Sequence, residues 1–169
     1  MFFFETWLRP YSTLESHFRI DNYKIFCRDR LGRSGGGLLV YSKNSLDTRR
    51  RHDLEDDRIE CLTVELSTKR TTTNDKCLFF CCYRPPDQSV DIFFDTLADL
   101  LYTAEAEGAI TFVLGDFNAK HSSWDPVAGP NAAGTRLFRL LLDFSLVQCV
   151  QTPTRASADG DSFSTILLT

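Results

Sequence analysis

The sequence lacks the residue spacings that build common zinc and redox sites. It has three histidines and one methionine, and no two cysteines are spaced Cys-x-x-Cys. This absence argues against a zinc ribbon or a thioredoxin-like site. The six cysteines lie mostly in or beside apolar runs, in a chain with enough apolar residues for a core. We therefore expect small buried side chains in a reducing compartment, and no disulfide framework.

Long apolar runs are also missing. No run approaches the length of a membrane span, and Phe2-Phe3-Phe4 is too short for a signal peptide because Glu5 interrupts it. Phe2 to Phe4 is more typical of the end of a buried strand. We therefore predict an intracellular protein without a signal peptide, a transmembrane segment or a membrane partner.

Positive charge is not in excess. The formal net charge is −4, whereas proteins that bind nucleic acid usually carry a basic surface that replaces counterions. The run Arg49-Arg50-Arg51-His52 is followed at once by acidic residues 53 and 55–57. A solvated loop is the first interpretation of this run, and a phosphate contact is the alternative. Only a local basic face would reconcile the acidity with DNA binding.

The order of apolar and polar segments predicts a single domain over residues 1–169, in which strands alternate with helices. Gly35-Gly36-Gly37 is not followed by Gly-Lys-Ser/Thr and precedes a strand, so it predicts a turn or bulge and not a phosphate-binding loop. A polar loop is expected at 67–76, and the longest loop at 122–132. The predicted strands are 23–27, 38–41, 58–66, 77–83 and 109–114, and the predicted helices are 89–107 and 133–144.

The most informative segment, residues 115–124, reads Gly-Asp-Phe-Asn-Ala-Lys-His-Ser-Ser-Trp. It follows the apolar strand at 109–114, and Gly115 is expected to let the chain turn sharply. Residues two apart in an extended segment project to the same side, so Asp116 and Asn118 are predicted to share a cavity above a buried Phe117. A carboxylate beside a carboxamide suits phosphate ester chemistry, because one group positions a water and the other donates to a charged oxygen.

This segment resembles the metal-dependent endonuclease/exonuclease/phosphatase superfamily of DNase I and apurinic endonucleases. The longer string is similar to the branch found in non-LTR, jockey-like retrotransposons. Three further blocks agree in order and spacing, a fourth segment with Asp29-Arg30 also fits, and the resemblance covers nearly the whole chain. They are Glu5-Thr6-Trp7-Leu8, Asp29-Arg30 with the glycines and strand at 35–41, Cys82-Tyr83-Arg84-Pro85-Pro86, and Gln151-Thr152-Pro153-Thr154-Arg155.

The resemblance implies a DNase I-like α/β fold, in which two packed β-sheets are flanked by helices and the chain is incomplete at both termini. It also implies Mg²⁺-dependent hydrolysis of DNA, with Mn²⁺ as a possible substitute. Glu5 would hold the metal, and the catalytic residues would be Asp116, Asn118 and Tyr83. Substrate-binding roles fall to Thr154, Arg84, His121 and Trp124.

Several of these residues also have plainer interpretations. Glu5 could be an exposed acid at a strand end, Tyr83 an ordinary strand-end aromatic, and Arg84 a solvated surface residue. If Tyr83 and Thr154 bind phosphate, both are expected to open onto the pocket of Asp116 and to be partly exposed. His121 is not expected to be the general base, because the family's main catalytic histidine comes later in the chain.

The chain departs from the family pattern at both ends. It begins almost at the glutamate block, it has Thr165 where the resemblance implies an aspartate, and no histidine follows His121. We therefore expect weak or absent nicking by this chain, and the reverse transcriptase of a full element protein is absent from it. Three hypotheses stay open: a retroelement DNA endonuclease acting in the nucleus, another phosphoesterase of the same fold, or a non-catalytic relic.

Overall fold

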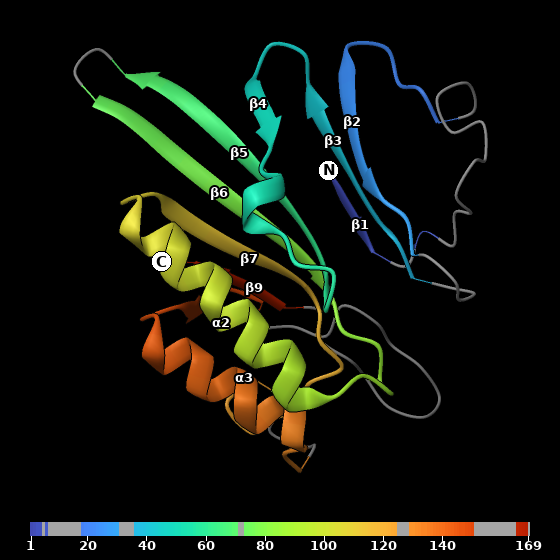
Figure 1. Ribbon diagram of the computed structural model, residues 1–169, viewed down its shortest axis with the longest axis vertical. Coiled ribbons are helices and arrows are strands. Elements are labelled where there is room, and N and C mark those ends of the chain that lie inside the picture. The colour runs from blue at the N-terminus through green and yellow to red at the C-terminus, as the bar shows by residue number, and fades with distance from the viewer. Residues whose placement is uncertain are drawn as a thin grey trace.

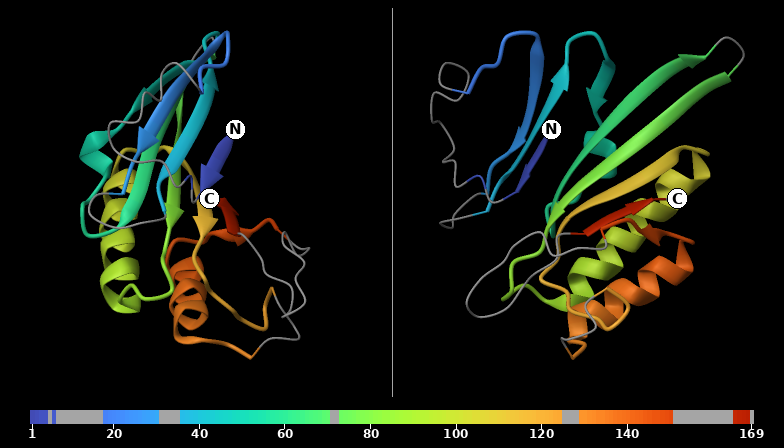
Figure 2. Two further views of the ribbon diagram at one scale, coloured as in Figure 1. Left: turned by 90° about the vertical axis from the view of Figure 1, so that its right-hand side faces the viewer. Right: turned by 180° about the vertical axis from the view of Figure 1, so that it is seen from behind.

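Two β-sheets pack against each other, and two helices cover the outer face of the larger sheet (Figures 1 and 2). The computed structural model describes residues 1–4, 6, 18–30, 36–70, 73–124, 129–150 and 165–168. In these residues the fold is an α/β sandwich, as the sequence predicts. The smaller sheet has the strand order β1-β3-β2, and the larger has the order β4-β5-β6-β7-β9-β8.

In the larger sheet the edge strands β4 and β8 are short, whereas β5 and β6 form a long hairpin. In the smaller sheet both β1 and β2 run antiparallel to β3. In the larger sheet β6 and β7 run parallel, connected through α2, and the other described pairs are antiparallel. The strands are β1 Phe2–Phe4, β2 Tyr23–Arg28, β3 Leu38–Lys43, β4 Asp47–Arg50, β5 Glu60–Arg70, β6 Thr73–Tyr83, β7 Ile110–Asp116, β8 Val147–Gln148 and β9 Thr165–Leu168.

The hairpin of β5 and β6 corrects one sequence prediction. The segment 67–76 was expected to be a polar loop, but strand pairing continues through it, with Ser67 opposite Lys76 and Lys69 opposite Asn74. Polar side chains do not prevent a strand where the backbone ladder is complete, and threonine favours extended structure. The absence of an apolar face therefore misled the prediction.

Both helices lie where the apolar periodicity predicts them. Helix α2 spans Val90–Ala106, and the side chain of Ser89 caps it by accepting from the Ile92 N–H. Gly108 follows its end with φ +64°, a left-handed conformation that suits glycine. Helix α3 spans Ala132–Asp143, with the single-turn helix η1 at His52–Leu54 elsewhere in the chain. None of the described helices is both long and apolar enough to cross a membrane.

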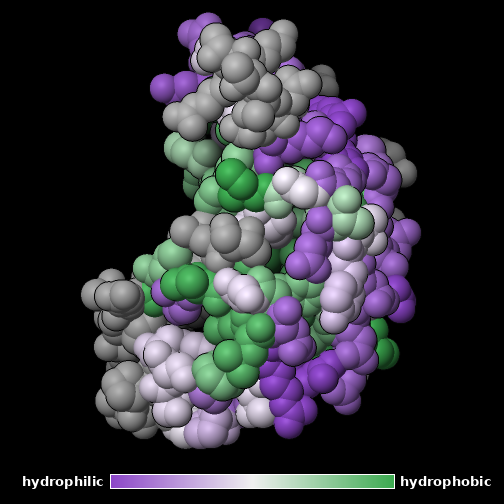
Figure 3. All heavy atoms as spheres, turned by 90° about the vertical axis from the view of Figure 1, so that its left-hand side faces the viewer, coloured by the Kyte–Doolittle hydropathy of each residue, from purple (hydrophilic) through white to green (hydrophobic). Residues whose placement is uncertain are grey.

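Two hydrophobic clusters form the core. The larger lies between the six-stranded sheet and the helices, around Phe80, Phe93 and Phe117. The smaller lies between the two sheets, and Val40, Val64 and other side chains of β3, β5, β6 and β7 contribute to it. Apolar residues also gather in the middle of one face, beside a band of polar residues (Figure 3). Part of the apolar surface on this face is therefore exposed, in addition to the apolar side chains that the two clusters bury.

The cysteines and the first strand only partly follow expectation. Cys61, Cys81 and Cys82 are buried and free, and burial raises the pKa of the Cys81 and Cys82 thiols, which keeps them as unreactive packing groups. Cys149 is exposed, contrary to prediction. Phe2 and Phe3 do form a strand, but they are 37% and 46% exposed, because β1 has only one described neighbour, β3. That strand is therefore an edge and not a buried core strand.

Candidate active site

Three residues form a row across the larger sheet at the end where β6 and β7 finish. Glu60 of β5 lies opposite Tyr83 of β6, and Tyr83 lies opposite Asp116 of β7. Residues that are in register across a sheet project to the same face. By alternation, this face carries Leu62 and Leu114, which belong to the cluster between the sheets. The row therefore closes one end of that cluster with polar groups.

Asp116 and Asn118 are brought together, but not by the expected geometry. Gly115 does not start a turn, because β7 continues through it to Asp116. Gly115 is needed for a close approach, since a Cβ there would lie 2.1 Å from the Cys82 carbonyl oxygen. The turn occurs at Asn118, whose φ is +47°, and its backbone N–H donates to Asp116 Oδ1 at 3.0 Å. Phe117 is 1% exposed, so its predicted place in the core is confirmed.

Arg84 lies beneath this turn, and the solvated surface interpretation is wrong. The residue is 3% exposed. Its Nε donates to the Phe117 carbonyl at 2.7 Å, its Nη2 to the Asn118 carbonyl at 3.3 Å, and its Nη1 to the carbonyls of Pro85 and Gln88. Asn118 Nδ2 in turn donates to the Arg84 carbonyl at 2.9 Å.

These bonds change the role assigned to Arg84. Burial lowers the pKa of its guanidinium, while the nearby Asp116 carboxylate acts in the opposite direction. Its donors face backbone carbonyls, which fixes the Asp-Phe-Asn turn in place. Arg84 therefore holds the turn, and its predicted contact with substrate stays a prediction.

Tyr83 is more buried than the sequence suggested. It is 5% exposed and belongs to the cluster between the sheets, so the expectation of a partly exposed phenol is wrong. The physical reason is its place in the row, where the smaller sheet covers the inner face of β6. The guanidinium carbon of Arg30 lies 5.5 Å from the centre of its ring.

His121 and Trp124 pack together on the loop after the turn. The His121 ring stacks on Phe138 of α3 at 4.4 Å and lies 5.0 Å from the Trp124 ring. His121 Nδ1 accepts from the Ser123 N–H at 3.2 Å, so in the neutral ring the proton lies on Nε2. Trp124 is 6% exposed, and its Nε1 donates to the Ala119 carbonyl. Trp124 thus braces the loop from inside, and His121 is the more accessible of the two.

Two predicted site residues, Glu5 and Thr154, lie outside the described residues. The neighbours of Glu5 are described: Phe4 pairs with Leu38, and the Thr6 N–H donates to the Gly37 carbonyl at 3.2 Å. The N–H of Gly37 in turn donates to Glu60 at 3.2 Å. Contacts therefore run continuously from Thr6 to the row that ends at Asp116. On the other side of β7, Thr165 pairs with Gly115.

The basic run at 49–51 is not a solvated loop. Arg49 and Arg50 belong to β4, and Arg51 is 7% exposed. Arg51 donates to Asp53, to Glu65 at 2.7 Å and to Glu107, and these bonds raise the pKa of its guanidinium. The phosphate-contact interpretation also finds no support, because carboxylates already occupy this guanidinium. The sequence did not reveal Glu65 and Glu107 as its partners, since both lie far along the chain.

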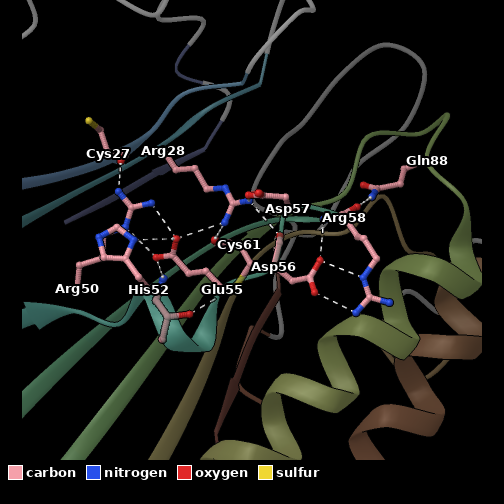
Figure 4. A network of polar contacts seen from close by, with 11 residues as sticks. Cys27, Arg28, Arg50, His52, Glu55, Asp56, Asp57, Arg58, Cys61 and Gln88 are labelled. Atoms are coloured by element: carbon pink, nitrogen blue, oxygen red, sulfur yellow. Dashed lines mark hydrogen bonds and ion pairs between the residues drawn. The ribbon is translucent and has the colours of Figure 1, made fainter.

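A cleft of about 1100 Å³ adjoins the row on the side of β2 and β4. Four arginines line it, and each is paired: Arg28 donates to Glu55 and to the Cys61 carbonyl, and Arg50 donates to Glu55 and to the Cys27 carbonyl (Figure 4). Arg58 pairs with Asp56, and Arg30 pairs with Glu60. The cleft also has six carboxylates, so it is no ready phosphate site. Its lining is Arg28, Asp29, Arg30, Arg50, His52, Glu55, Asp56, Asp57, Arg58, Ile59, Glu60, Pro85, Asp87 and Gln88.

The described side chains do not by themselves form a metal centre. Within them, no group of three histidine, cysteine or acidic residues is placed to hold an ion. Of the two carboxylates in the row, Glu60 is bound to Arg30 and to the Gly37 N–H. Asp116 offers an oxygen ligand of the kind that Mg²⁺ prefers, and this ion needs only one or two carboxylates because it keeps several waters. The row thus fits a hydrated ion at Asp116 if a second carboxylate joins it.

A family of proteins described as endonuclease-reverse transcriptases matches residues 77–169, more than half of the chain. The chain belongs to this family. The matched region contains Tyr83 and Asp116 of the row and Asn118 of the turn, whereas Glu60 lies outside it. No curated protein sequence matches the chain significantly.

Several solved structures share the fold of this chain. The endonuclease domain of TRAS1, a telomere-specific non-LTR retrotransposon, aligns with a TM-score of 0.64 at 15% identity, over 89% of this chain and 68% of that one. An AP endonuclease from Leishmania major aligns with a TM-score of 0.69 at 14% identity, over 92% and 64%. The catalytic domain of human Nocturnin aligns with a TM-score of 0.53 at 9% identity, over 87% and 60%. At these identities the likeness establishes the DNase I-like fold.

Proposed function

We propose that this domain, a member of the endonuclease-reverse transcriptase family, hydrolyses a DNA phosphodiester with the help of Mg²⁺, or of Mn²⁺ in its place. It would nick target DNA in the nucleus as part of a longer protein that carries a reverse transcriptase. The observation that carries the proposal is the Asp116–Asn118 turn, which Arg84 holds at the polar end of the sheet. A family match that includes the turn supports the same chemistry.

Each residue of the turn has a distinct chemical task in this proposal. Asp116 positions the attacking water, and the carboxamide of Asn118 donates to a phosphate oxygen. Asn118 Nδ2 bonds to the Arg84 carbonyl through one hydrogen, so its second hydrogen serves the substrate. Tyr83 donates to the phosphate, and Glu5 holds the ion, which stabilises charge on the phosphate and on the leaving oxygen. Thr154 is a further phosphate donor, and the ring of His121 with Trp124 beside it faces the DNA.

The 169 residues are expected to nick weakly by themselves. No histidine follows His121 in the sequence, and His121 is held in an aromatic stack with its Nδ1 occupied. Loss of one member of a catalytic unit commonly costs several orders of magnitude in rate. An extended protein with an upstream strand, Thr165→Asp and a downstream Ser-Asp-His segment should therefore nick far faster.

The test is nicking of supercoiled plasmid in Mg²⁺, with EDTA as the blank. We expect weak or undetectable nicking by the chain itself and strong, EDTA-sensitive nicking by the extended protein. Asp116→Ala in the extended protein should abolish the gain. Asn118→Gly keeps the left-handed backbone but removes the carboxamide, so it should lower the rate without unfolding the protein. Full activity of the extended Asp116→Ala protein would refute the proposed site.

A non-catalytic relic is the second candidate function. The observation that favours it is the burial of Tyr83, because a buried side chain must become accessible before it can donate to a phosphate. Under this hypothesis the extended protein would stay inactive although folded, while the chain could still bind DNA. Strong EDTA-sensitive nicking by the unmodified chain would contradict both the relic hypothesis and the expected weak nicking. Loss of that nicking in His121→Ala would then show that His121 acts in place of the missing histidine.

A further inference from the structure

Glu60 is a carboxylate in the row to which the proposed chemistry gives no task. It is the first residue of β5 and lies directly opposite Tyr83. One of its oxygens accepts from the Gly37 N–H at 3.2 Å, and the other pairs with the Arg30 guanidinium. Its side chain is only 17% exposed. A carboxylate so enclosed, with a cation and a backbone donor bound to it, is fixed in one orientation.

Arg30 links this carboxylate to the aromatic ring of the row. Its side chain is 16% exposed, and its guanidinium carbon lies 5.5 Å from the centre of the Tyr83 ring. A cation over the face of an aromatic ring is attracted to it and orients it. Positive charge near a phenol also makes the hydroxyl a stronger hydrogen-bond donor, since it stabilises negative charge that builds on the oxygen.

The glycines before β3 show how closely the chain packs on this pair. A Cβ at Gly36 would lie 2.6 Å from Arg30 Nε and 2.7 Å from a Glu60 oxygen. Both Gly36 and Gly37 have positive φ, at +79° and +91°. Glycine is thus required here both for backbone conformation and for space. This finding gives the predicted turn at the glycines a physical purpose, which is to let the backbone reach the carboxylate.

We propose that Arg30 and Glu60 are a positioning pair for Tyr83. Glu60 holds Arg30 over the ring, and Arg30 fixes the direction of the phenol and strengthens it as a donor toward a phosphate oxygen. Because the Glu60 carboxylate and the Tyr83 ring already occupy the guanidinium, Arg30 acts through Tyr83 and is not itself a phosphate ligand. The part of the proposal that concerns phosphate rests on the function proposed above, whereas the hold on Tyr83 does not.

The hold on Tyr83 is tested by NMR of protein labelled in its tyrosine rings, with the Tyr83 signal assigned through Tyr83→Phe. Arg30→Met and Glu60→Gln should both shift this signal. Arg49→Met is the control, because it also removes one arginine that pairs with a glutamate of β5. In this case the partner is Glu65, at 2.9 Å and away from Tyr83. This variant should leave the Tyr83 signal in place. An unchanged Tyr83 signal in folded Arg30→Met would overturn the proposal.

The consequence for substrate is tested by a double-mutant cycle on binding of a short DNA duplex in Mg²⁺, measured by fluorescence anisotropy. Arg30→Met should weaken binding about fivefold when Tyr83 is present, equivalent to ~1 kcal/mol, and should have no effect beside Tyr83→Phe. Arg30→Lys should recover part of the loss. Arg49→Met should behave alike in both backgrounds.

The two experiments separate the two proposals. Equal losses from Arg30→Met with and without Tyr83 would show that Arg30 does not act through the phenol, which refutes the pair. If the unmodified protein binds no duplex, the proposed DNA function fails. The NMR result alone then decides whether Arg30 and Glu60 position Tyr83.

Discussion

Two buried arginines hold two different regions of this molecule, and they do so with opposite kinds of partner. Arg51, 7% exposed, binds the carboxylates of Asp53, Glu65 and Glu107, which joins β4 and β5 to the end of α2. Arg84, 3% exposed, donates to backbone carbonyls in the loops after β6 and β7. The carboxylates raise the pKa of Arg51, whereas burial lowers that of Arg84.

The kind of partner determines how each region should respond to pH. A carboxylate partner titrates, so the region around Arg51 should respond to pH. A carbonyl partner does not titrate, so the hold of Arg84 on the turn that carries Asp116 and Asn118 should depend less on pH. The first arginine connects secondary structure elements, and the second gives irregular backbone a fixed form at the proposed site.

The largest expected effect is on the region around Arg51. Arg51→Met should lower the free energy of unfolding by about 3 kcal/mol, because the buried Glu65 carboxylate then keeps only the exposed Arg49 as its cation. Arg49→Met is the control: its side chain is 63% exposed, and its loss should cost less than about 1 kcal/mol. Urea unfolding at neutral pH measures both. Equal losses would show that burial does not distinguish these arginines.

The same region should lose its advantage in acid. Hydrogen bonds from Arg51 lower the pKa of Asp53 and Glu107, and bonds from Arg49 and then Arg51 lower that of Glu65. Carboxyls with lowered pKa stabilise the fold above their unfolded pKa values, and this contribution is lost as pH falls through the folded ones. The gap in stability between the natural protein and Arg51→Met should therefore shrink progressively below about pH 4.5. Chemical unfolding at a series of pH values tests this, and a constant gap would contradict it.

Arg84→Met should cost about 2–3 kcal/mol, because several buried carbonyls lose their donor. Arg84→Lys should recover little, since one ammonium cannot replace a planar fork of donors. This loss should depend on pH less than the Arg51 loss does, because Arg84 interacts with the carboxylates of Asp116 and Asp87 only through space and not through a hydrogen bond. Arg58→Met, at a 58% exposed arginine, is the control. Hydrogen exchange at the Asn118 amide should rise in Arg84→Met alone.

The smallest expected effect concerns the contact of α3 with the loop after Asn118. A Cβ at Gly134 in α3 would lie 1.8 Å from the Lys120 carbonyl oxygen. Gly→Ala in a helix usually stabilises by about 1 kcal/mol, but here it should destabilise by about 1–2 kcal/mol because the backbone must move. Gly129→Ala, where no atom lies within 4 Å, should be nearly neutral. Thermal unfolding compares the two, and a stabilising Gly134→Ala would show that the loop does not rest on α3.

Much of this fold follows from local pattern. The period of Phe93, Leu97 and Leu101 predicts α2, and Gly108 marks its end, as observed. The apolar strand before Asp116 was also predicted, because a buried strand must carry apolar side chains on both faces. The polar half of the β5–β6 hairpin was missed, since it forms by backbone pairing that leaves no apolar signal.

The sequence predicted that Asp116 and Asn118 lie together, but it did not predict the geometry of their contact. Asp116 and Asn118 were expected to project together from an extended chain, but the contact comes from a left-handed turn at Asn118. Arg84 looked like a surface charge because its acceptors are carbonyls, which every residue has and no sequence distinguishes. One signal for Glu60 was available: it is an acidic residue in phase with Leu62 and Val64 on the inward face of β5.

The sequence by itself determined both helices, most of the strands and the close contact of Asp116 with Asn118, because period, capping and glycine act over a few neighbouring residues. Only the tertiary structure decided which distant groups pair. Arg51 finds Glu107 at the end of α2, Arg84 finds the carbonyl of Phe117, and Arg30 reaches Glu60 and Tyr83. These partners are far apart along the chain, and the cost of leaving buried charge and backbone unpaired fixes them only once the sheets and helices have packed.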